Sequence, residues 1–396
     1  MTTPVQPTQT NTHISSNFGK LLEPGLRKIF FETYAEYPEQ FSQVFKVNNS
    51  SKAKETDYGL GAFSDWEKRW TNLDTVAYDT LSAGMERTYV HEAFTKGFMI
   101  ERELYDDEQY RQINKFPAAM ARSGRAHVEK SAATMLNLAF YESSPIYDGV
   151  PLIGTHNLVD SASTCTNLVT GALNDANLKI AMQCMGEQLD EAGNLIAMNA
   201  TKLVVPPALE FVAKEIVNST QKAGTDLNDV NTIKGSLQVV VLDYIGSAAG
   251  GSDTAWFLID GNNHELNFFW RKKPEFKWDE DFDTFVAKYR GYMRFSFGAS
   301  DWRGIVGSTG GLAASTKPVV TAPTKNTATV SVTTCVKDAA LKLVVDKKVV
   351  ATTVATGTTA SFTGLNDKVL ATGSKVAVIQ TEKGKAPTCS EVVTVS

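Results

Sequence analysis

The residue types that most often carry catalysis are few in this sequence and stand apart from one another. His127 and His156 have no serine or cysteine motif beside them that a general base could activate, so we interpret both as structural. The acidic stretch 278–283 (WDEDFD) could hold a cation, but it lacks the glycine and the downstream glutamate of an EF-hand loop. We therefore interpret this stretch as a solvated turn.

Motifs for nucleotides and metals are missing as well. The chain has no GxxxxGK[ST], GxGxxG or HExxH pattern. A hydrolase is disfavoured because no nucleophile is paired with a base. The sequence thus predicts no catalytic residue, no cofactor and no metal site, and we expect a protein that is not an enzyme.

The composition is that of a folded protein rather than a disordered or membrane-spanning one. Of the 396 residues, 42% are hydrophobic and 21% are charged. No apolar run approaches the roughly 18 residues that cross a bilayer. The N-terminus (MTTPVQPTQTNTH) has neither the basic start nor the apolar core of an export signal, so we expect neither membrane contact nor export.

Charge is divided unevenly along the chain. Residues 317–396 hold ten lysines, no arginine and five acidic residues, which leaves this segment at +5 and the preceding 316 residues at −10. An acidic body lacks the surplus of Lys and Arg that phosphate binding requires. We therefore expect no sequence-specific recognition of nucleic acid.

The composition changes near residue 312, before a segment rich in β-branched residues. The last 80 residues contain 16 Thr and 16 Val, and Phe362 is their only aromatic. Six short apolar runs separated by turn signals predict an immunoglobulin-like β-sandwich over 318–396. The small residues at 313–317 predict a flexible linker, so removal of 313–396 is expected to leave the body competent.

The body mixes helices and strands. A helix is expected over 23–37, an extended segment over 88–100 and a long helix over 117–140. The long helix carries an i, i+4 stripe, and the small residue Gly124 in that stripe suggests close contact with another backbone. The stripe includes Met120, Gly124, Val128 and Leu136.

A second set of elements follows the long helix. Helices are expected over 175–190 and 208–219, with the turn DEAGN and the short strand LVVPP between them. The runs LQVVVLDYI and WFLID predict core strands of a sheet that helices flank. Up to this point the residues indicate a non-catalytic α/β protein with an appended β-sandwich.

Three stretches carry a more specific resemblance. They are 97–110 (GFMIERELYDDEQY), 186–219 and 282–308, of which the middle one combines a helix, a D-x-x-G-N turn, a strand, paired prolines and a second helix. In this order they resemble the major capsid proteins of tailed bacteriophages, most closely the Mu-type major head subunit. The resemblance covers about residues 15–308.

The resemblance implies an α+β fold of the Hong Kong 97 type, with the long helix as the spine of a peripheral domain and an axial domain at hexamer and pentamer centres. The implied division is an N-terminal arm at 1–22, a peripheral domain at 23–49, 98–145 and 286–312, an extended loop at 50–97 and an axial domain at 146–285.

The resemblance also implies a function and partners. The subunit would assemble with copies of itself in the host bacterial cytoplasm, with a separate scaffolding protein, a portal and decoration proteins, into a virion shell around double-stranded DNA. Trp66 and Trp70 in the extended loop would contact a neighbouring subunit. An encapsulin-like protein container and a bacterial surface adhesin stay open as alternatives.

Two kinds of covalent link are considered, a lysine cross-link between subunits and a disulfide. Some proteins of this fold cross-link a lysine of the extended loop, but no acceptor is matched here, so Lys52, Lys54 and Lys68 are expected to be solvated. Cys335 and Cys389 lie at the same end of the expected sandwich and could form a disulfide. Two reduced thiols are the alternative that a bacterial cytoplasm favours.

Overall fold

The structure is a computed structural model of the chain. It describes residues 18–60, 62–63, 78, 83–101, 103, 110–141, 146, 148–158, 163–221, 229–281, 286–311, 315–325, 329–346, 348–365, 370–382 and 388–396. These residues belong to two compact units, which are described separately. The first comprises 1–38, 91–128 and 270–295, and the second comprises 39–90, 129–269 and 296–396. No helix in the described ranges is long and apolar enough to cross a membrane.

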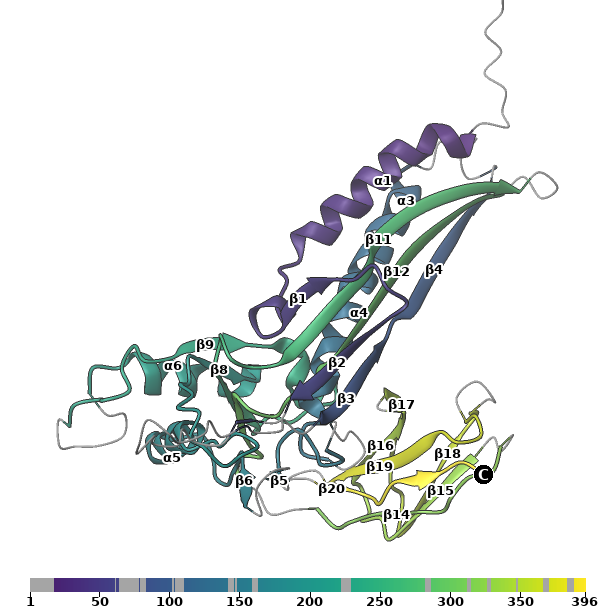
Figure 1. Ribbon diagram of the computed structural model, residues 1–396. Helices are drawn as coiled ribbons and strands as arrows, with labels where there is room; N and C mark the ends of the chain where they lie inside the picture. Colours follow the sequence, from purple (N-terminus) through teal and green to yellow (C-terminus); the bar gives the residue numbers. More distant parts are fainter. Residues whose placement is uncertain are drawn as a thin grey trace, which may run out of the picture. The chain divides into compact units, whose positions relative to one another are not determined.

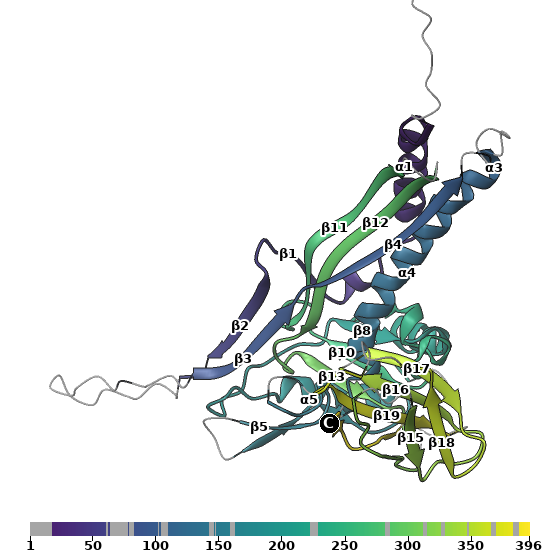
Figure 2. The same cartoon turned by 90° about the vertical axis from the view of Figure 1, so that its right-hand side faces the viewer.

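The first unit is built from long helices beside long strands (Figures 1 and 2). A short helix, α3 (Tyr110–Ile113), precedes α4. The long helices are α1 (Phe18–Glu36) and α4 (Lys115–Asn137). The strands beside them have the order β11-β12-β4, with β11 at Leu266–Asp281, β12 at Val286–Ala299 and β4 at Glu92–Glu101. Strand β1 (Lys46–Asn49) belongs to the second unit.

Antiparallel pairing fixes the register of β4 and β12. Gly97 lies opposite Arg290, and Ile100 lies opposite Ala287. One apolar core joins these strands to α1 and α4, and its buried members are Leu26, Phe30, Ile100, Ile113, Met120, Ala121, Phe276, Ala287 and Tyr289. The extended segment expected over 88–100 is confirmed for residues 92–100, which belong to β4.

Several sequence-based boundaries differ from the structure, among them that of the helix expected over 175–190, which ends at Gly186. The first helix starts at Phe18 rather than at residue 23 and contains Pro24. Helix α4 ends at Asn137, three residues before the expected end at 140, because the chain turns there and the Asn137 side-chain amide donates to the Tyr244 carbonyl at 3.0 Å. The expected turn at 278–283 is wrong for 278–281, which continue β11, and residues 282–285 lie outside the described ranges.

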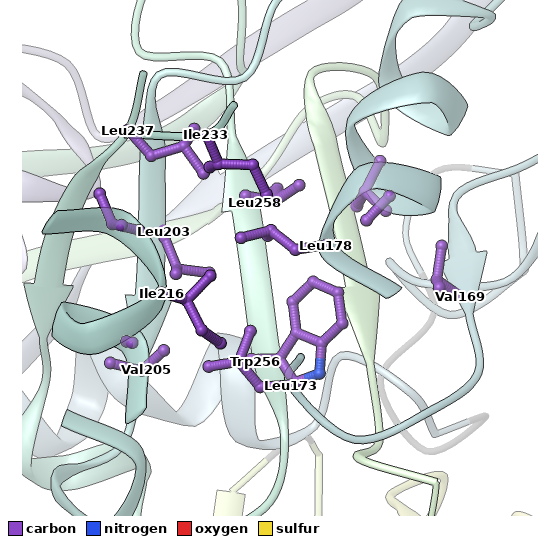
Figure 3. Packing of buried hydrophobic residues seen from close by; sticks show 14 of the residues in the cluster. Val169, Leu173, Leu178, Leu203, Val205, Ile216, Ile233, Leu237, Trp256 and Leu258 are labelled. Atoms are coloured by element: carbon purple, nitrogen blue, oxygen red, sulfur yellow. The ribbon is translucent and has the colours of Figure 1, made fainter. Parts of the chain in front are cut away.

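The second unit contains a five-stranded sheet of order β7-β13-β10-β8-β9. Its strands are β7 (Leu168–Val169), β13 (Ile305–Ser308), β10 (Trp256–Ile259), β8 (Lys202–Val205) and β9 (Gln238–Val241). Helices α5 (Asp175–Gly186) and α6 (Glu210–Asn218) pack on this sheet. Figure 3 shows the resulting core, in which Trp256, Leu178 and Ile216 lie together.

Local sequence explains where these helices begin and turn. The Asn174 side chain caps α5 by accepting a hydrogen bond from the Asn177 amide. In the DEAGN turn, the Asp190 carboxylate accepts from the Ala192 and Asn194 amides. Gly193 has φ of 90°, a left-handed conformation that glycine adopts without strain. The predicted helix, turn, strand and helix are confirmed in this order.

Smaller elements complete the second unit. A two-stranded hairpin joins β2 (Lys54–Leu60) to β3 (Ala83–Val90), and β5 (Thr155–Asn157) pairs with β6 (Thr164–Thr166). Single 3-10 turns are η2 (Phe41–Gln43), η3 (Pro207–Leu209), η4 (Asp243–Ile245) and η5 (Ser247–Ala249).

The C-terminal segment is a sandwich of two sheets around one core (Figure 1). One sheet holds β14 (Val319–Val320), β15 (Thr329–Thr333) and β18 (Thr359–Thr363). The other holds β17 (Lys348–Val354), β16 (Ala340–Val345), β19 (Lys375–Thr381) and β20 (Thr388–Cys389), with β21 (Val393–Thr394) also paired to β19.

Residues 315 and 316, directly before the sandwich, are held by hydrogen bonds, although the composition of this segment predicts a flexible linker. The Thr316 amide donates to the Glu382 carboxylate at 2.6 Å, and the Gln380 side chain donates to the Thr316 carbonyl at 3.0 Å. Ser315 is buried and accepts from the Glu382 amide. The expectation of a flexible linker is therefore wrong at 315–316, because hydrogen bonds hold these residues to the end of β19.

Candidate assembly surfaces

The stripe on α4 is buried as expected, but its glycine has a different role. Met120, Val128 and Leu136 are buried. A Cβ placed on Gly124 would have a single neighbour within 4 Å among the described atoms, namely Tyr34 Cε2 at 3.8 Å. Close contact with another backbone is therefore absent in the described part of the chain, and the explanation offered for Gly124 is wrong.

Gly124 instead lines a groove that the sequence did not reveal. This groove lies within the first unit and has a volume of about 440 Å³. Aromatic side chains form part of its wall, because α1 contributes Phe30 and Tyr34 while β4 contributes Phe94. The His127 ring packs against Phe94 at 4.5 Å, which agrees with a packing role for this histidine. Helices and strands from distant parts of the chain form the groove, so no local motif could have indicated it.

The β2–β3 hairpin presents apolar side chains at its surface. Tyr58 is 64% exposed and Val90 is 65% exposed, although the neighbouring Tyr89 is only 3% exposed. The Tyr89 hydroxyl is hydrogen-bonded to the Ser300 hydroxyl, and its ring packs on Phe269 at 5.1 Å. Burial raises the pKa of Tyr89. The base of β3 is thus anchored while the rest of the hairpin offers surface for contact.

Trp66 and Trp70 cannot be placed on this surface, because both lie outside the described residues. The same holds for Lys68. Lys52, by contrast, is exposed and pairs with Glu55 at 3.1 Å. Along the sequence, the described residues that flank the two tryptophans are Phe63 and Tyr78, which are 62% and 90% exposed.

His156 belongs to a buried stack of side chains. His156 has no exposed side-chain surface, its Nδ1 is 2.5 Å from the Asp148 carboxylate, and its ring is parallel to that of Trp302 at 4.5 Å. The Arg303 guanidinium lies 4.5 Å from the Trp302 ring and pairs with Glu191 at 3.0 Å. This arrangement agrees with a structural role, since neither a serine nor a cysteine is hydrogen-bonded to the ring within the described ranges.

Acidic and sulfur-containing residues form no metal site in the described ranges, where no three His, Cys, Asp or Glu residues gather closely enough. None of the four cysteines, all of which lie in the described ranges, is part of a disulfide. Cys335 is buried in the core of the sandwich, whereas Cys389 is half-buried and packs beside Tyr141. Cys335 and Cys389 are therefore reduced in the structure.

The sandwich also contacts the body of the second unit. Leu138 and Tyr141, which follow α4, pack with Val344 and Ile379 of the sandwich. The Lys342 ammonium donates a hydrogen bond to the Gly250 carbonyl, and burial lowers the pKa of this lysine. This contact was missed from the sequence because its members are separated by some 90 to 240 residues.

Comparison with known proteins gives a family for these elements. A family model described as phage capsid protein matches residues 84–308, which is more than half of the chain. No curated protein matches the sequence.

Among solved structures, the chain is similar to the procapsid of bacteriophage JBD30, at 16% identity and a TM-score of 0.40, covering 73% of this chain and 74% of that one. It is similar to the capsid of Myoviridae phage XM1 at 15% identity and a TM-score of 0.41, with coverage of 68% and 90%. For the virus-like particle from Pyrococcus furiosus the identity is 8%, the TM-score 0.42 and the coverage 72% and 98%. These likenesses are distant, so the family match carries the conclusion.

Proposed function

Because the chain belongs to the phage capsid protein family, we propose that it is the major head subunit of a tailed phage. It self-assembles through hexamers and pentamers into an icosahedral shell that encloses double-stranded DNA. The observation that carries this proposal is the family match, which covers residues 84–308, from β3 through α4 and the five-stranded sheet to β13. A shell protein needs no active site, and the sequence shows no nucleophile paired with a general base.

The division of the subunit is part of the proposal. The peripheral domain takes 23–49, 98–145 and 286–312, the axial domain takes 146–285, and 50–97 form an extended loop over a neighbouring subunit. The exposed Tyr58 and Val90 on the hairpin support the loop assignment, because apolar side chains on a thin hairpin gain most from burial against another chain. Residues 1–22 act as the N-terminal arm.

The proposed partners follow from the kind of particle. A separate scaffolding protein directs assembly in the host cytoplasm, a portal occupies one vertex, and decoration proteins bind outside. The shell holds DNA by enclosing it. The first 316 residues of each subunit carry a net charge of −10, which repels phosphate rather than binding it. The C-terminal sandwich is displayed on the outer surface.

An immunoglobulin-like topology for the sandwich is supported by its strand order. The first, second and fifth strands share one sheet, and the third, fourth, sixth and seventh share the other, counted from β14 to β20. This division between two sheets is typical of immunoglobulin-like domains.

Assembly of the purified protein tests the proposal. The full chain is expressed alone and together with a scaffolding protein, then examined by negative-stain electron microscopy and size-exclusion chromatography. We expect closed shells or capsomers, because the loop and the arm are buried only against neighbours. A monodisperse 43.1 kDa species under all conditions would overturn the proposal. Shells that take up protein instead of DNA would indicate an encapsulin-like container.

A further inference from the structure

Two free thiols lie close to each other beside the core of the second unit. Cys165 is the middle residue of β6, and Cys184 lies in the last turn of α5. The Cys184 thiol donates to the carbonyl of Thr166 at 3.2 Å, and Thr166 is the residue directly after Cys165. The Cys184 sulfur is therefore within hydrogen-bonding distance of the backbone of the residue that follows Cys165.

The pairing of β5 with β6 indicates where the Cys165 side chain lies. Cys165 is directly opposite His156, and opposite residues of an antiparallel pair project from the same face. The His156 side chain is fully buried, so Cys165 is on the inward face of the β5–β6 pair. Cys184, for its part, packs against the apolar core that α5 covers.

The ionisation of Cys184 is consistent with this proximity. Burial raises the pKa of its thiol to about 11, and the neighbouring Cys165 contributes to the rise. Both cysteines are only half-buried, so small oxidants can reach them.

We propose that Cys165 and Cys184 form a disulfide when the protein leaves the reducing host cytoplasm, which ties β6 covalently to α5. The timing depends on the proposed function, since a virion is released by lysis into an oxidising medium. The capacity to form the bond is a property of the folded subunit itself.

A small disulfide such as oxidised glutathione supplies the oxidant. The Cys165 thiolate attacks one of its sulfur atoms, the S–S bond of the oxidant breaks, and one glutathione thiolate leaves. Cys184 then loses its proton to water, gives up its hydrogen bond to Thr166 and attacks the Cys165 sulfur, so that the second glutathione leaves. Two protein thiols lose two protons and two electrons, and one oxidant molecule becomes two thiols.

The chain offers a matched control pair. Cys335 lies in the core of the sandwich and its thiol is directed to the Val332 carbonyl of the preceding strand, at 3.8 Å. Cys389 belongs to the separate cluster around Leu138 and Tyr141. The double variant Cys335→Ser/Cys389→Ser removes these thiols without touching β6 or α5.

The test uses the full chain, reduced, desalted and incubated with oxidised glutathione. Thiols are counted after denaturation, and the linked peptides are identified by mass spectrometry. We expect the count to fall from four to two in the wild type and from two to zero in Cys335→Ser/Cys389→Ser. The oxidised protein should also melt at a higher temperature than the reduced protein, and dithiothreitol should reverse this shift.

The single variant Cys184→Ser distinguishes a disulfide between the two cysteines from a mixed disulfide with glutathione. Cys184→Ser should stop at Cys165 carrying one bound glutathione, whereas the wild type should carry none. Four thiols that persist in the wild type, or glutathione retained on both cysteines, would overturn the proposal. Shell formation is scored separately by microscopy, so failure of the disulfide and failure of the capsid assignment give different results.

Discussion

His264 is a buried histidine that the fold keeps neutral. It is 2% exposed, and its Nδ1 accepts a hydrogen bond from the Leu266 amide at 3.1 Å. Burial, together with the charges of Lys46 and Lys202, lowers the pKa of His264 from 6.5 to about 4, although Asp260 acts in the opposite direction. A protonated ring would lose its role as acceptor and would place a cation near two lysines.

The sign of the pH dependence follows from this lowered pKa. Above pH 6.5 the ring is neutral in both the folded and the unfolded chain, so its contribution to stability is fully present. As pH falls toward 4, only the unfolded chain takes up the proton, and the free energy of unfolding decreases. We expect a loss of about 1–2 kcal/mol at pH 5 relative to pH 7.5.

Urea denaturation of the wild type and of His264→Asn at both pH values measures this loss. Asparagine can still accept from the Leu266 amide but does not titrate. The variant should therefore lose less stability than the wild type between pH 7.5 and pH 5. Equal losses in the two proteins would show that other groups carry the acid sensitivity.

Two glycines form a matched pair for a second prediction. A Cβ on Gly251 would lie 1.9 Å from the Ile245 carbonyl oxygen and 2.4 Å from Asn137 Oδ1, so the backbone must shift. A Cβ on Gly124 would meet only Tyr34, at an ordinary 3.8 Å. We expect Gly251→Ala to lower the free energy of unfolding by about 1–3 kcal/mol.

Gly124→Ala should act in the opposite direction. Alanine is favoured over glycine inside a helix by about 0.5–1 kcal/mol, and the groove beside Gly124 leaves room for the methyl group. Thermal melts of the two variants provide the comparison. If Gly124→Ala were as destabilising as Gly251→Ala, the surroundings assigned to Gly124 would be incorrect.

Among the elements, the β2–β3 hairpin is the one whose expected role lies in assembly. Replacing Trp66 and Trp70 together with Ala should reduce shell formation, since large aromatics in a polar segment are typical anchors between subunits. The circular dichroism of the unassembled variant should stay close to that of the wild type. Particle yield from electron microscopy is the readout, and normal shells of normal stability would contradict the prediction.

Local patterns predicted the type of most elements better than their ends. The i, i+4 stripe indicated α4 because a helix buries one face whatever it packs against, and alternating β-branched runs indicated the strands of the sandwich. The end of α4 depends instead on Asn137, whose partner Tyr244 is 107 residues away. Residues 278–281 are in a strand although four of the six residues in WDEDFD are acidic, because they extend the long strand β11.

At the scale of the molecule, the sequence predicted the family but not the surfaces between its parts. Composition alone separated the last 80 residues from the body, and this suggested a tethered module. Whether such a module is tethered or docked depends on which side chains face one another, as Leu138 and Val344 do. The aromatic groove escaped prediction for the same reason, since α1, α4 and β4 each contribute only part of its wall.

The docked sandwich changes the expected result of truncation. Removal of residues 313–396 would uncover Leu138 and Tyr141, which are 1% and 9% exposed in the full chain, and would leave the Gly250 carbonyl without its lysine partner. Newly exposed apolar surface promotes association, so we expect the truncated chain to give less soluble protein and fewer shells.

A change inside the full chain separates docking from simple loss of a domain. Ile379→Asp would place a carboxylate in the contact with Leu138 and Tyr141, whereas Lys337→Ala removes an exposed charge of the same sandwich. We expect the first variant to speed amide hydrogen exchange in residues 136–141, because an unpaired charge opens the contact, and the second to leave exchange unchanged. Unchanged exchange in both variants, together with normal shells from the truncated chain, would mean that the sandwich is a dispensable module after all.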